Sequence, residues 1–197
     1  MRVQPPSLLP LLRSAVQGKI LATVYLSPER EFSVSELARL ADASLKATAQ
    51  EVDRLATAGL LADRRSGNQR LVRRPEPGRI ITPLTELLAA TFGPLPVLAE
   101  ELRGVPGIEE AFIYGSWAAR ASGVPGGPPN DVDVLAIGVP SLDDLDDVAE
   151  RASARLHRAV NIRRLSADYW AAPPANDVFV GAVKQQPLVA IPSEEQE

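Results

Sequence analysis

The stretch SVSELARLADASLKATAQEVDRLATAGLL, residues 33–61, decides the fold of the first part of this chain. Ser33 is followed three residues later by Glu36, the pattern of a capping box, so a helix is expected over 33–41. A short turn comes next, and Ser44 then has the chemistry of an N-cap. The stretch therefore predicts two helices joined by a tight turn.

The second of these helices is expected over 44–58, with Gly59 just past its end. Helical spacing divides its residues between an inner and an outer face. The inner face is predicted to carry Leu45, Ala49, Val52, Leu55 and Ala56. The outer face is predicted to carry Lys46, Thr48, Gln50, Asp53 and Arg54. This outer face is polar enough to meet water or a polar partner.

The flanking sequence completes one small domain. Apolar residues at helical spacing predict an earlier helix over 7–26. After Gly59 the chain reads as a hairpin, with arms over 60–65 and 69–74 around a Gly-containing turn. Three helices followed by a basic hairpin describe a winged helix-turn-helix. Residues 8–75 resemble the ArsR- and MarR-type transcriptional regulators, and residues 33–61 are the most typical part.

Charge is distributed unevenly along the 197 residues. Residues 1–80 hold 13 Lys and Arg against 8 Asp and Glu, a net charge of +5, whereas residues 81–197 hold 8 against 17, a net charge of −9. The basic front predicts contact with a polyanion. The chain has no Cys, which excludes disulfides, thiolate metal sites and a cysteine nucleophile.

A winged helix binds DNA with its third helix in the major groove and its hairpin along the backbone. The candidates on the helix are Ser44, Lys46, Thr48, Gln50 and Arg54. The candidates on the hairpin, for phosphate contacts, are Arg64, Arg65, Arg70, Arg73 and Arg74. The alternative is a winged helix that binds another protein. A long first helix suits a homodimer, which would need a pseudo-palindromic DNA site.

Proline and glycine mark a boundary after the hairpin, at Pro75, Pro77 and Gly78. Two short helices are expected near 83–91 and 95–103, the first with Pro83 at its first position. The expected organisation is a winged helix-turn-helix domain over 1–78, a helical linker over 79–107 and a second domain over 108–197.

The second domain alternates strands and helices. The expected strands cover 108–114, 131–137, 160–165 and 186–191. The expected helices cover 116–121, 141–157 and 167–172, and an acidic tail begins at residue 193. We therefore expect an α+β chain, in which the second domain is a small α/β domain with a mixed sheet.

Two motifs in this domain carry chemistry: AFIYGSWAAR, residues 111–120, and NDVDVLAIG, residues 130–138. In the first, Gly115 lets the backbone approach a phosphate, and Ser116 offers a hydroxyl at a helix start. In the second, Asp131 and Asp133 lie two residues apart and so share one face of a strand. Two convergent carboxylates suit Mg²⁺, although an Asp-x-Asp strand is also a common solvated face.

Taken in order, the motifs resemble the minimal nucleotidyltransferases of the DNA polymerase beta superfamily, over residues 95–191. That resemblance implies transfer of a nucleoside monophosphate from a nucleoside triphosphate to a hydroxyl with Mg²⁺. It implies that Gly115 and Ser116 bind phosphate and that Asp131 and Asp133 bind metal. Arg120 either reaches the triphosphate or is an ordinary surface arginine.

The sequence departs from this family at the third carboxylate, where it reads Val160-Asn161-Ile162. Asn161 supplies neither charge nor a proton acceptor. The loop around 123–129 is also longer than usual. Either the reaction proceeds with two carboxylates, or the domain binds a nucleotide without turning it over.

Three functions remain open. The first is a DNA-binding regulator whose second domain binds Mg²⁺-nucleotide as a sensor or weak enzyme. The second is an active nucleotidyltransferase acting on RNA, protein or a small molecule, with the winged helix for targeting or autoregulation, as in toxin–antitoxin systems. The third is a purely structural pairing module. No targeting or membrane segment is evident, so a cytoplasmic protein is expected.

Overall fold

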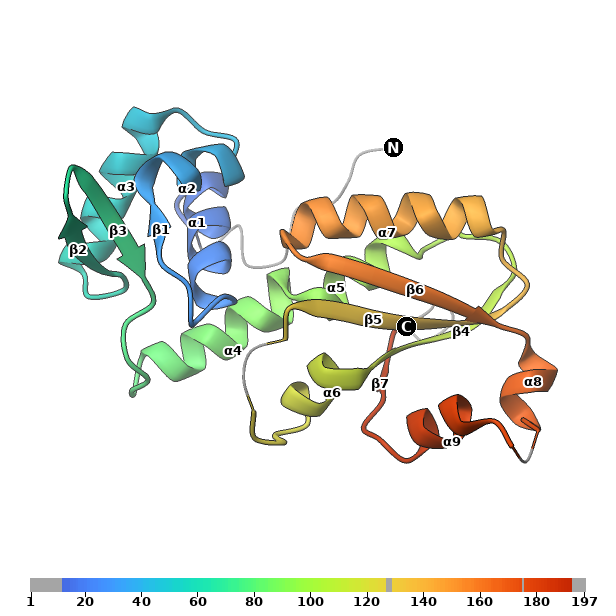
Figure 1. Ribbon diagram of the computed structural model, residues 1–197. Coiled ribbons are helices and arrows are strands. Elements are labelled where there is room, and N and C mark those ends of the chain that lie inside the picture. Colours follow the sequence, from blue (N-terminus) through green and yellow to red (C-terminus); the bar gives the residue numbers. More distant parts are fainter. Residues whose placement is uncertain (1–11, 127–128, 175, 193–197) are drawn as a thin grey trace. The chain divides into compact units, whose positions relative to one another are not determined.

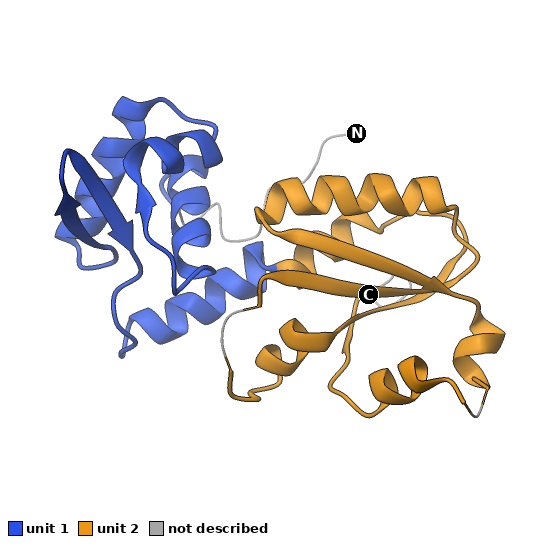
Figure 2. Cartoon of the chain, viewed as in Figure 1, with its two compact units in different colours: residues 1–93 blue, residues 94–197 orange. Residues whose placement is uncertain are grey.

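The computed structural model describes residues 12–126, 129–174 and 176–192. The chain divides into two compact units, Met1–Gly93 and Pro94–Glu197 (Figure 2). The boundary falls between the two helices that the sequence placed in a linker, so each unit contains one of them. The class is α+β, as predicted, with one sheet in each unit.

Unit 1 has the element order of a winged helix (Figure 1). Its elements are α1 (Ala15–Tyr25), β1 (Phe32–Ser33), α2 (Val34–Leu40), α3 (Leu45–Thr57), β2 (Ala62–Ser66), β3 (Gln69–Arg73) and α4 (Ile81–Phe92). The strands form an antiparallel sheet in the order β1-β3-β2. The hairpin of β2 and β3 is the wing.

Serine side chains cap the starts of α1, α2 and α3 in unit 1. Ser33 Oγ accepts from the Glu36 amide at 3.1 Å, and Ser44 Oγ accepts from the Ala47 amide at 3.2 Å. Both predicted N-caps are therefore confirmed. The first helix is shorter than predicted, because Ser14 caps it and α1 begins at Ala15. The earlier part of that prediction, 7–11, lies outside the described residues.

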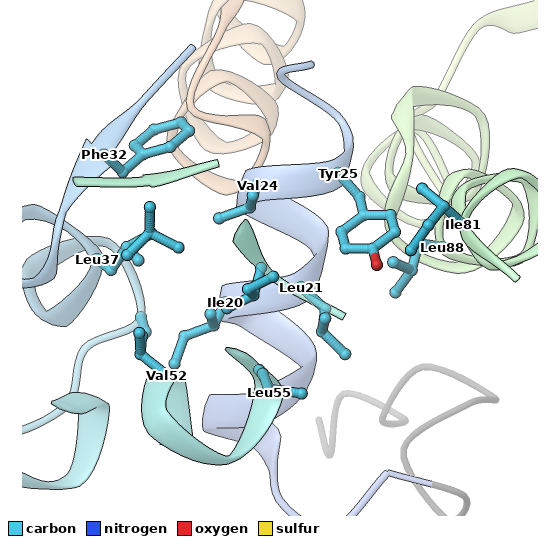
Figure 3. Packing of buried hydrophobic residues seen from close by; sticks show 13 residues of the cluster. Ile20, Leu21, Val24, Tyr25, Phe32, Leu37, Val52, Leu55, Ile81 and Leu88 are labelled. Carbon is cyan, nitrogen blue, oxygen red and sulfur yellow. The ribbon is translucent and has the colours of Figure 1, made fainter. Parts of the chain in front are cut away.

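The core of unit 1 gathers side chains from α1, α3 and α4 (Figure 3). Ile20 and Val24 of α1 are fully buried, and Leu55 of α3 packs with them. Ile81 and Leu88 bring α4 against Tyr25, as Figure 3 shows. Because α4 contributes these two side chains, it belongs to unit 1 and does not act as a free linker.

The buried face of α3 differs from the predicted one. Leu45, expected inside, is 57% exposed, whereas Thr48, expected outside, is completely buried. Thr48, Val52 and Leu55 follow the spacing i, i+4, i+7 and form the buried stripe with Glu51. Leu45 is the first residue of the helix, and its side chain lies outside the core. Its apolar character therefore led to the wrong assignment of the inner face.

Unit 2 is built on a four-stranded mixed sheet in the order β6-β5-β4-β7. Its elements are α5 (Pro94–Glu101), β4 (Ile108–Tyr114), α6 (Gly115–Ala121), β5 (Asp131–Gly138), α7 (Leu142–Leu156), β6 (Ala159–Leu165), α8 (Ala167–Ala171), α9 (Val178–Lys184) and β7 (Val189–Ala190). Strands β5 and β6 are parallel, and β4 is antiparallel to both of its neighbours, β5 and β7.

Alternate residues of the sheet bury into two different clusters. Ile113, Val134 and Val160 pack with α5 and α7 on one face. Leu135 and Ile137 pack with residues of α8 and α9 on the other. Only part of this second face is apolar, because the strand positions before Leu135 on the same face are Asp131 and Asp133.

One helix and two element boundaries after the wing differ from the predictions. Helix α9 was not predicted; Asp177 caps it by accepting from the Val180 amide at 2.8 Å. The expected strand over 186–191 shortens to Val189–Ala190. Helix α4 begins at Ile81, so Pro83 lies within its first turn, where the backbone needs no donor.

The segment Ile81–Glu101 is long and apolar enough, by length and composition alone, to cross a membrane, which the sequence analysis did not expect. Gly93 interrupts it, and α4 and α5 lie on either side. Leu88 is buried in the core of unit 1 and Leu98 in that of unit 2. Packing into the two cores accounts for part of the apolar composition, since 33% of the apolar window is buried.

Candidate functional site

The outer face of α3 is the candidate DNA-reading surface of unit 1. Lys46 and Gln50 are exposed there, and neither has an ion pair or a side-chain hydrogen bond among the described residues. The Ser44 hydroxyl is occupied as the N-cap of α3. Thr48 is buried and cannot reach a ligand from this position. The reading face is therefore smaller than the sequence predicted.

Arg64 and Arg70 of the wing are held by acidic side chains. Arg64 Nε donates to Glu31 Oε1 at 2.8 Å, and this bond holds the pKa of the Glu31 carboxyl below its usual range. Arg70 Nε donates to Asp63 Oδ2 at 2.7 Å, and another of its nitrogens donates to Asp53 of α3. Arg70 thus ties the wing to the candidate reading helix.

The remaining predicted arginines divide into paired and unpaired ones. Arg54 donates to Glu51 at 2.8 Å, and Arg73 donates to Glu76 at 2.9 Å. Arg74 Nε is buried without a hydrogen-bond partner among the described residues. Arg65 is exposed, and no described residue forms an ion pair with it. Its position beside the turn leaves Arg65 as the wing cation most available to a phosphate.

Charge counting along the sequence did not reveal this neutralisation, because it depends on which acids the fold brings to the wing. The net charge of the first 80 residues does not show that acids just before β1, in α3 and in β2 converge on the wing. The acids that pair with the three wing arginines are Glu31, Asp53, Asp63 and Glu76. Such exposed pairs contribute little stability each, but they compete with phosphates for the same guanidinium groups.

In unit 2 the sheet aligns three polar side chains across neighbouring strands. Tyr114 of β4 pairs in register with Asp133 of β5, and Asp133 pairs with Asn161 of β6. Register partners on adjacent strands share a face, and Asp131 shares it because it lies two residues before Asp133. The two carboxylates predicted from sequence are therefore brought together, with Asn161 beside them.

The Asn161 amide bridges the carboxylate pair. Its Nδ2 lies 3.1 Å from Asp133 Oδ1 and 3.3 Å from Asp131 Oδ2. One nitrogen therefore marks a point that both carboxylates face. A neutral donor at that point reduces the repulsion between the two negative charges without removing either charge.

Gly115 stands directly against this pair. Its φ of +73° is a left-handed conformation that glycine adopts readily, and a Cβ added there would lie 2.9 Å from Asp133 Oδ2. The left-handed turn favours glycine, and a Cβ there would make the Asp133 carboxylate shift. Ser116 follows as an exposed residue in α6.

Arg120 lies under the loop that follows α6. Its Nε and Nη1 are buried without a hydrogen-bond partner among the described residues. A Cβ added to Gly126 would lie 1.7 Å from Arg120 Nη1, so the guanidinium packs closely against that glycine. The backbone at Gly126 thus packs against the Arg120 guanidinium. The predicted contact between Arg120 and a triphosphate stays a prediction.

The electrostatics around the carboxylate pair involve groups that the motifs did not include. Burial raises the pKa of Tyr114, and the nearby Asp133 charge raises it further. Burial lowers the pKa of Arg158, while the Asp131 charge opposes that shift. Arg163 lies over the Phe179 ring, with its central carbon 3.9 Å from the ring centroid. Neither arginine was singled out from sequence, because their proximity depends on strand pairing.

The two carboxylates supply the oxygen ligands that a hard cation prefers, but the Asn161 amide nitrogen lies at the point they share, so a cation there would have to replace it. Two carboxylate oxygens face a common point, and Asn161 carries an amide oxygen as well as the bridging nitrogen. Oxygen ligands of this kind suit Mg²⁺. The described residues contain no cluster of three or more His, Cys, Asp or Glu side chains suited to a metal. A separate hollow of about 380 Å³ lies near Val139 and Tyr169, away from the carboxylates.

No protein-family model and no curated protein matches the chain. Among solved structures, the chain is similar to the heme sensor protein PefR from Streptococcus agalactiae, in complex with heme. The identity is 16%, the match covers 45% of this chain and 59% of that chain, and the TM-score is 0.33. A match at that level carries no argument about function.

Proposed function

We propose that this chain is a DNA-binding regulator that contacts double-stranded DNA through unit 1 and a Mg²⁺-nucleotide through unit 2. The observation that carries the DNA proposal is the winged-helix element order, with Lys46 and Gln50 on the open face of α3. A helix so placed fits the major groove, where lysine and glutamine donate and accept at base edges.

In this proposal the wing adds positive charge for phosphate contacts and does not recognise bases. Arg65 is available for a phosphate, whereas Arg64, Arg70 and Arg73 must first leave their carboxylate partners. Phosphate contacts fix position on the duplex without distinguishing bases. A homodimer, presenting two such faces, would match a site with two-fold symmetry, and this assembly is part of the proposal.

Unit 2 binds nucleotide in this proposal through its carboxylate pair and the neighbouring turn. Asp131 and Asp133 would hold Mg²⁺, and the metal would neutralise phosphate charge when bound. Gly115 and Ser116 would lie beside those phosphates. Asn161 favours binding over turnover, because an amide neither adds charge for a metal nor accepts a proton.

A second function, nucleotidyl transfer to a hydroxyl, is favoured by one feature. Asn161 lies in register with Asp133, where the resemblance places a third carboxylate, so the polar row is kept although its chemistry has changed. Two carboxylates and a bound metal would then have to support the reaction. Mg²⁺-dependent release of pyrophosphate from a nucleoside triphosphate distinguishes this enzyme from the sensor.

The DNA proposal is tested by fluorescence anisotropy with labelled duplex from upstream of the chain's own coding sequence. We expect binding that weakens as salt rises, and a loss of affinity in Arg65→Ala and Lys46→Ala. Arg65→Ala should lower the slope of log K against log salt by about 0.9. Arg103→Ala, an exposed charge change in unit 2, is the control. Binding that does not depend on salt and is unchanged in both Arg65→Ala and Lys46→Ala would contradict the assignment.

The nucleotide proposal is tested by calorimetry, with Mg²⁺ and each of the four nucleoside triphosphates. We expect one of them to bind in a Mg²⁺-dependent manner, and Asp131→Asn to abolish that dependence. Binding without pyrophosphate release supports the sensor. Release that disappears in Asp131→Asn supports the enzyme, and the absence of binding to all four nucleotides would exclude both.

A further inference from the structure

Arg163 lies on the same sheet face as the carboxylate pair. It is two residues beyond Asn161 in β6 and pairs in register with Leu135, two residues beyond Asp133. Side chains two apart in a strand share a face, and their separation along the strand is about 7 Å. The cation therefore lies one step along the sheet from the point that Asp131 and Asp133 both face.

An aromatic platform holds the Arg163 guanidinium in place. The group stacks on Phe179 of α9 at 3.9 Å, and the Phe179 ring meets Tyr114 edge to face with ring centroids 5.8 Å apart. Tyr114 in turn pairs with Asp133 across the sheet. Stacking engages the face of a guanidinium and leaves the N–H groups at its edge free to donate.

The electrostatic surroundings of Arg163 distinguish it from the arginines of α7. Arg151 and Arg155 donate to Glu101 at 2.8 and 2.7 Å and so are neutralised within the unit. Arg163 is exposed, and no described carboxylate forms an ion pair with it. Its neighbour Arg164 points to the other face and donates to the Pro140 carbonyl at 2.8 Å. Arg163 is thus an oriented cation with no direct ion pair among the described residues. An acidic group that its charge does influence is Asp177, the N-cap of α9, whose pKa is lowered first by the Tyr169 hydrogen bond and in smaller part by the Arg163 charge.

We propose that Arg163 is a phosphate-binding residue of the unit 2 site. It would donate its N–H edge to a phosphate of a nucleoside di- or triphosphate whose Mg²⁺ is held by Asp131 and Asp133. The planar guanidinium matches phosphate oxygens in a bidentate manner. A phosphate chain is long enough to join the two points along the sheet. This inference rests on the proposed nucleotide binding and names a contact for it.

The test measures binding of Mg²⁺-ATP and of inorganic pyrophosphate to the full-length chain by calorimetry. If ATP is not the nucleotide bound by the wild-type chain, the triphosphate with measurable affinity replaces it. Arg163→Ala should weaken nucleotide binding about tenfold or more, since charge-assisted hydrogen bonds are the strong ones. Arg163→Lys should recover part of the loss, and Phe179→Leu, which keeps the cation without its platform, should weaken binding less than Arg163→Ala.

Arg164→Ala is the matched control, because it removes the same charge from the adjacent residue on the opposite face. Mn²⁺ binding without nucleotide, followed by electron paramagnetic resonance, should be unchanged in Arg163→Ala. Equal nucleotide affinity in wild type and Arg163→Ala would overturn this inference and leave the nucleotide function standing. Pyrophosphate binding that requires Arg163, without any nucleotide binding, would overturn the function and keep the anion site. No binding of either probe by the wild type would overturn both.

Discussion

Asn161 Nδ2 lies 3.1 Å from Asp133 Oδ1, and the same nitrogen reaches Asp131. The amide lies between two carboxylates at the place where a cation would reduce their repulsion most. A neutral donor between the two carboxylates reduces their repulsion without a metal, whereas a third acid at position 161 would increase it. If unit 2 binds Mg²⁺ as proposed, the identity of residue 161 should set how strongly the metal stabilises the fold.

The substitution Asn161→Asp tests that coupling. It puts three carboxylates on adjacent strand positions, and like charges facing each other destabilise a sheet by up to about 1 kcal/mol. We expect a lower Tm in the absence of metal and a larger rise on adding Mg²⁺ than in wild type, followed by differential scanning calorimetry. Asn161→Ala, which removes the bridge without adding charge, is the comparison. Equal Mg²⁺ stabilisation in both variants would show that residue 161 does not face the cation.

Gly115→Ala should disturb the same site from the adjacent turn. The left-handed φ of +73° costs an alanine about 1 kcal/mol, and the new Cβ would lie 2.9 Å from Asp133 Oδ2. We expect lower stability together with weaker Mg²⁺ binding, because Asp133 has to move. Gly123→Ala is the matched control, since its φ is +82° and no atom lies within 4 Å of its added Cβ. A Gly123→Ala variant with the same loss of Mg²⁺ affinity would remove the steric explanation.

Local signals in the sequence were enough for much of the fold. Ser33 and Ser44 predicted helix starts because an N-cap acts within three residues of its own position. Asp131 and Asp133 were found because alternation along one strand is a local property. Arg163 and its partner Phe179 were not connected, because strand register and the placement of α9 join residues that are distant in sequence.

The same limit explains the wing. Arg64 is 33 residues from its partner Glu31, so their pairing is visible only after β1, β2 and β3 have formed a sheet. Thr48 and Leu45 show a different limit. Helical spacing allows either residue to lie on the inner face of α3. Packing of α3 against its neighbours buries Thr48 and leaves Leu45 exposed. Composition gave the sign of the charge in each half, but not how much of it is neutralised internally.

Glu31→Gln should strengthen non-specific binding to duplex DNA. Arg64 loses its carboxylate partner and becomes available to a phosphate, so the slope of log K against log salt should steepen by about 0.9. Anisotropy titrations across a series of salt concentrations measure this directly. Glu86→Gln makes the same charge change at an exposed position of α4 and serves as the control. An unchanged slope in Glu31→Gln would mean that Arg64 does not face the DNA.

Thr48→Val should stabilise unit 1 while leaving DNA binding intact. Thr48 is completely buried, and its hydroxyl has no hydrogen-bond partner among the described residues. Valine has the same shape without a polar atom to desolvate, so a gain of about 1 kcal/mol in unfolding free energy is expected. Urea denaturation measures the gain. Lower DNA affinity in this variant, at unchanged helical content, would restore Thr48 to the reading face and contradict its burial.

Tyr25 predicts a loss of stability in alkali. Burial raises its pKa to about 12, against an opposing effect of the Arg74 charge, while an unfolded tyrosine ionises near pH 10. Above pH 10 the unfolded chain therefore releases a proton that the folded chain keeps. Each pH unit between 10 and 12 should then remove roughly 1.4 kcal/mol of unfolding free energy.

Tyr25→Phe isolates this contribution from those of other groups that titrate in alkali. At pH 8 the variant should be less stable by about 1 kcal/mol, because the Tyr25 hydroxyl donates to the Leu60 carbonyl at 2.7 Å. Phenylalanine has no proton to lose, so the stability of the variant should fall less steeply than that of wild type from pH 10 to 12. Urea denaturation at four or five pH values gives both curves. Their difference should shrink and then change sign as pH rises, and parallel curves would show that Tyr25 ionises as easily in the folded chain as in the unfolded one.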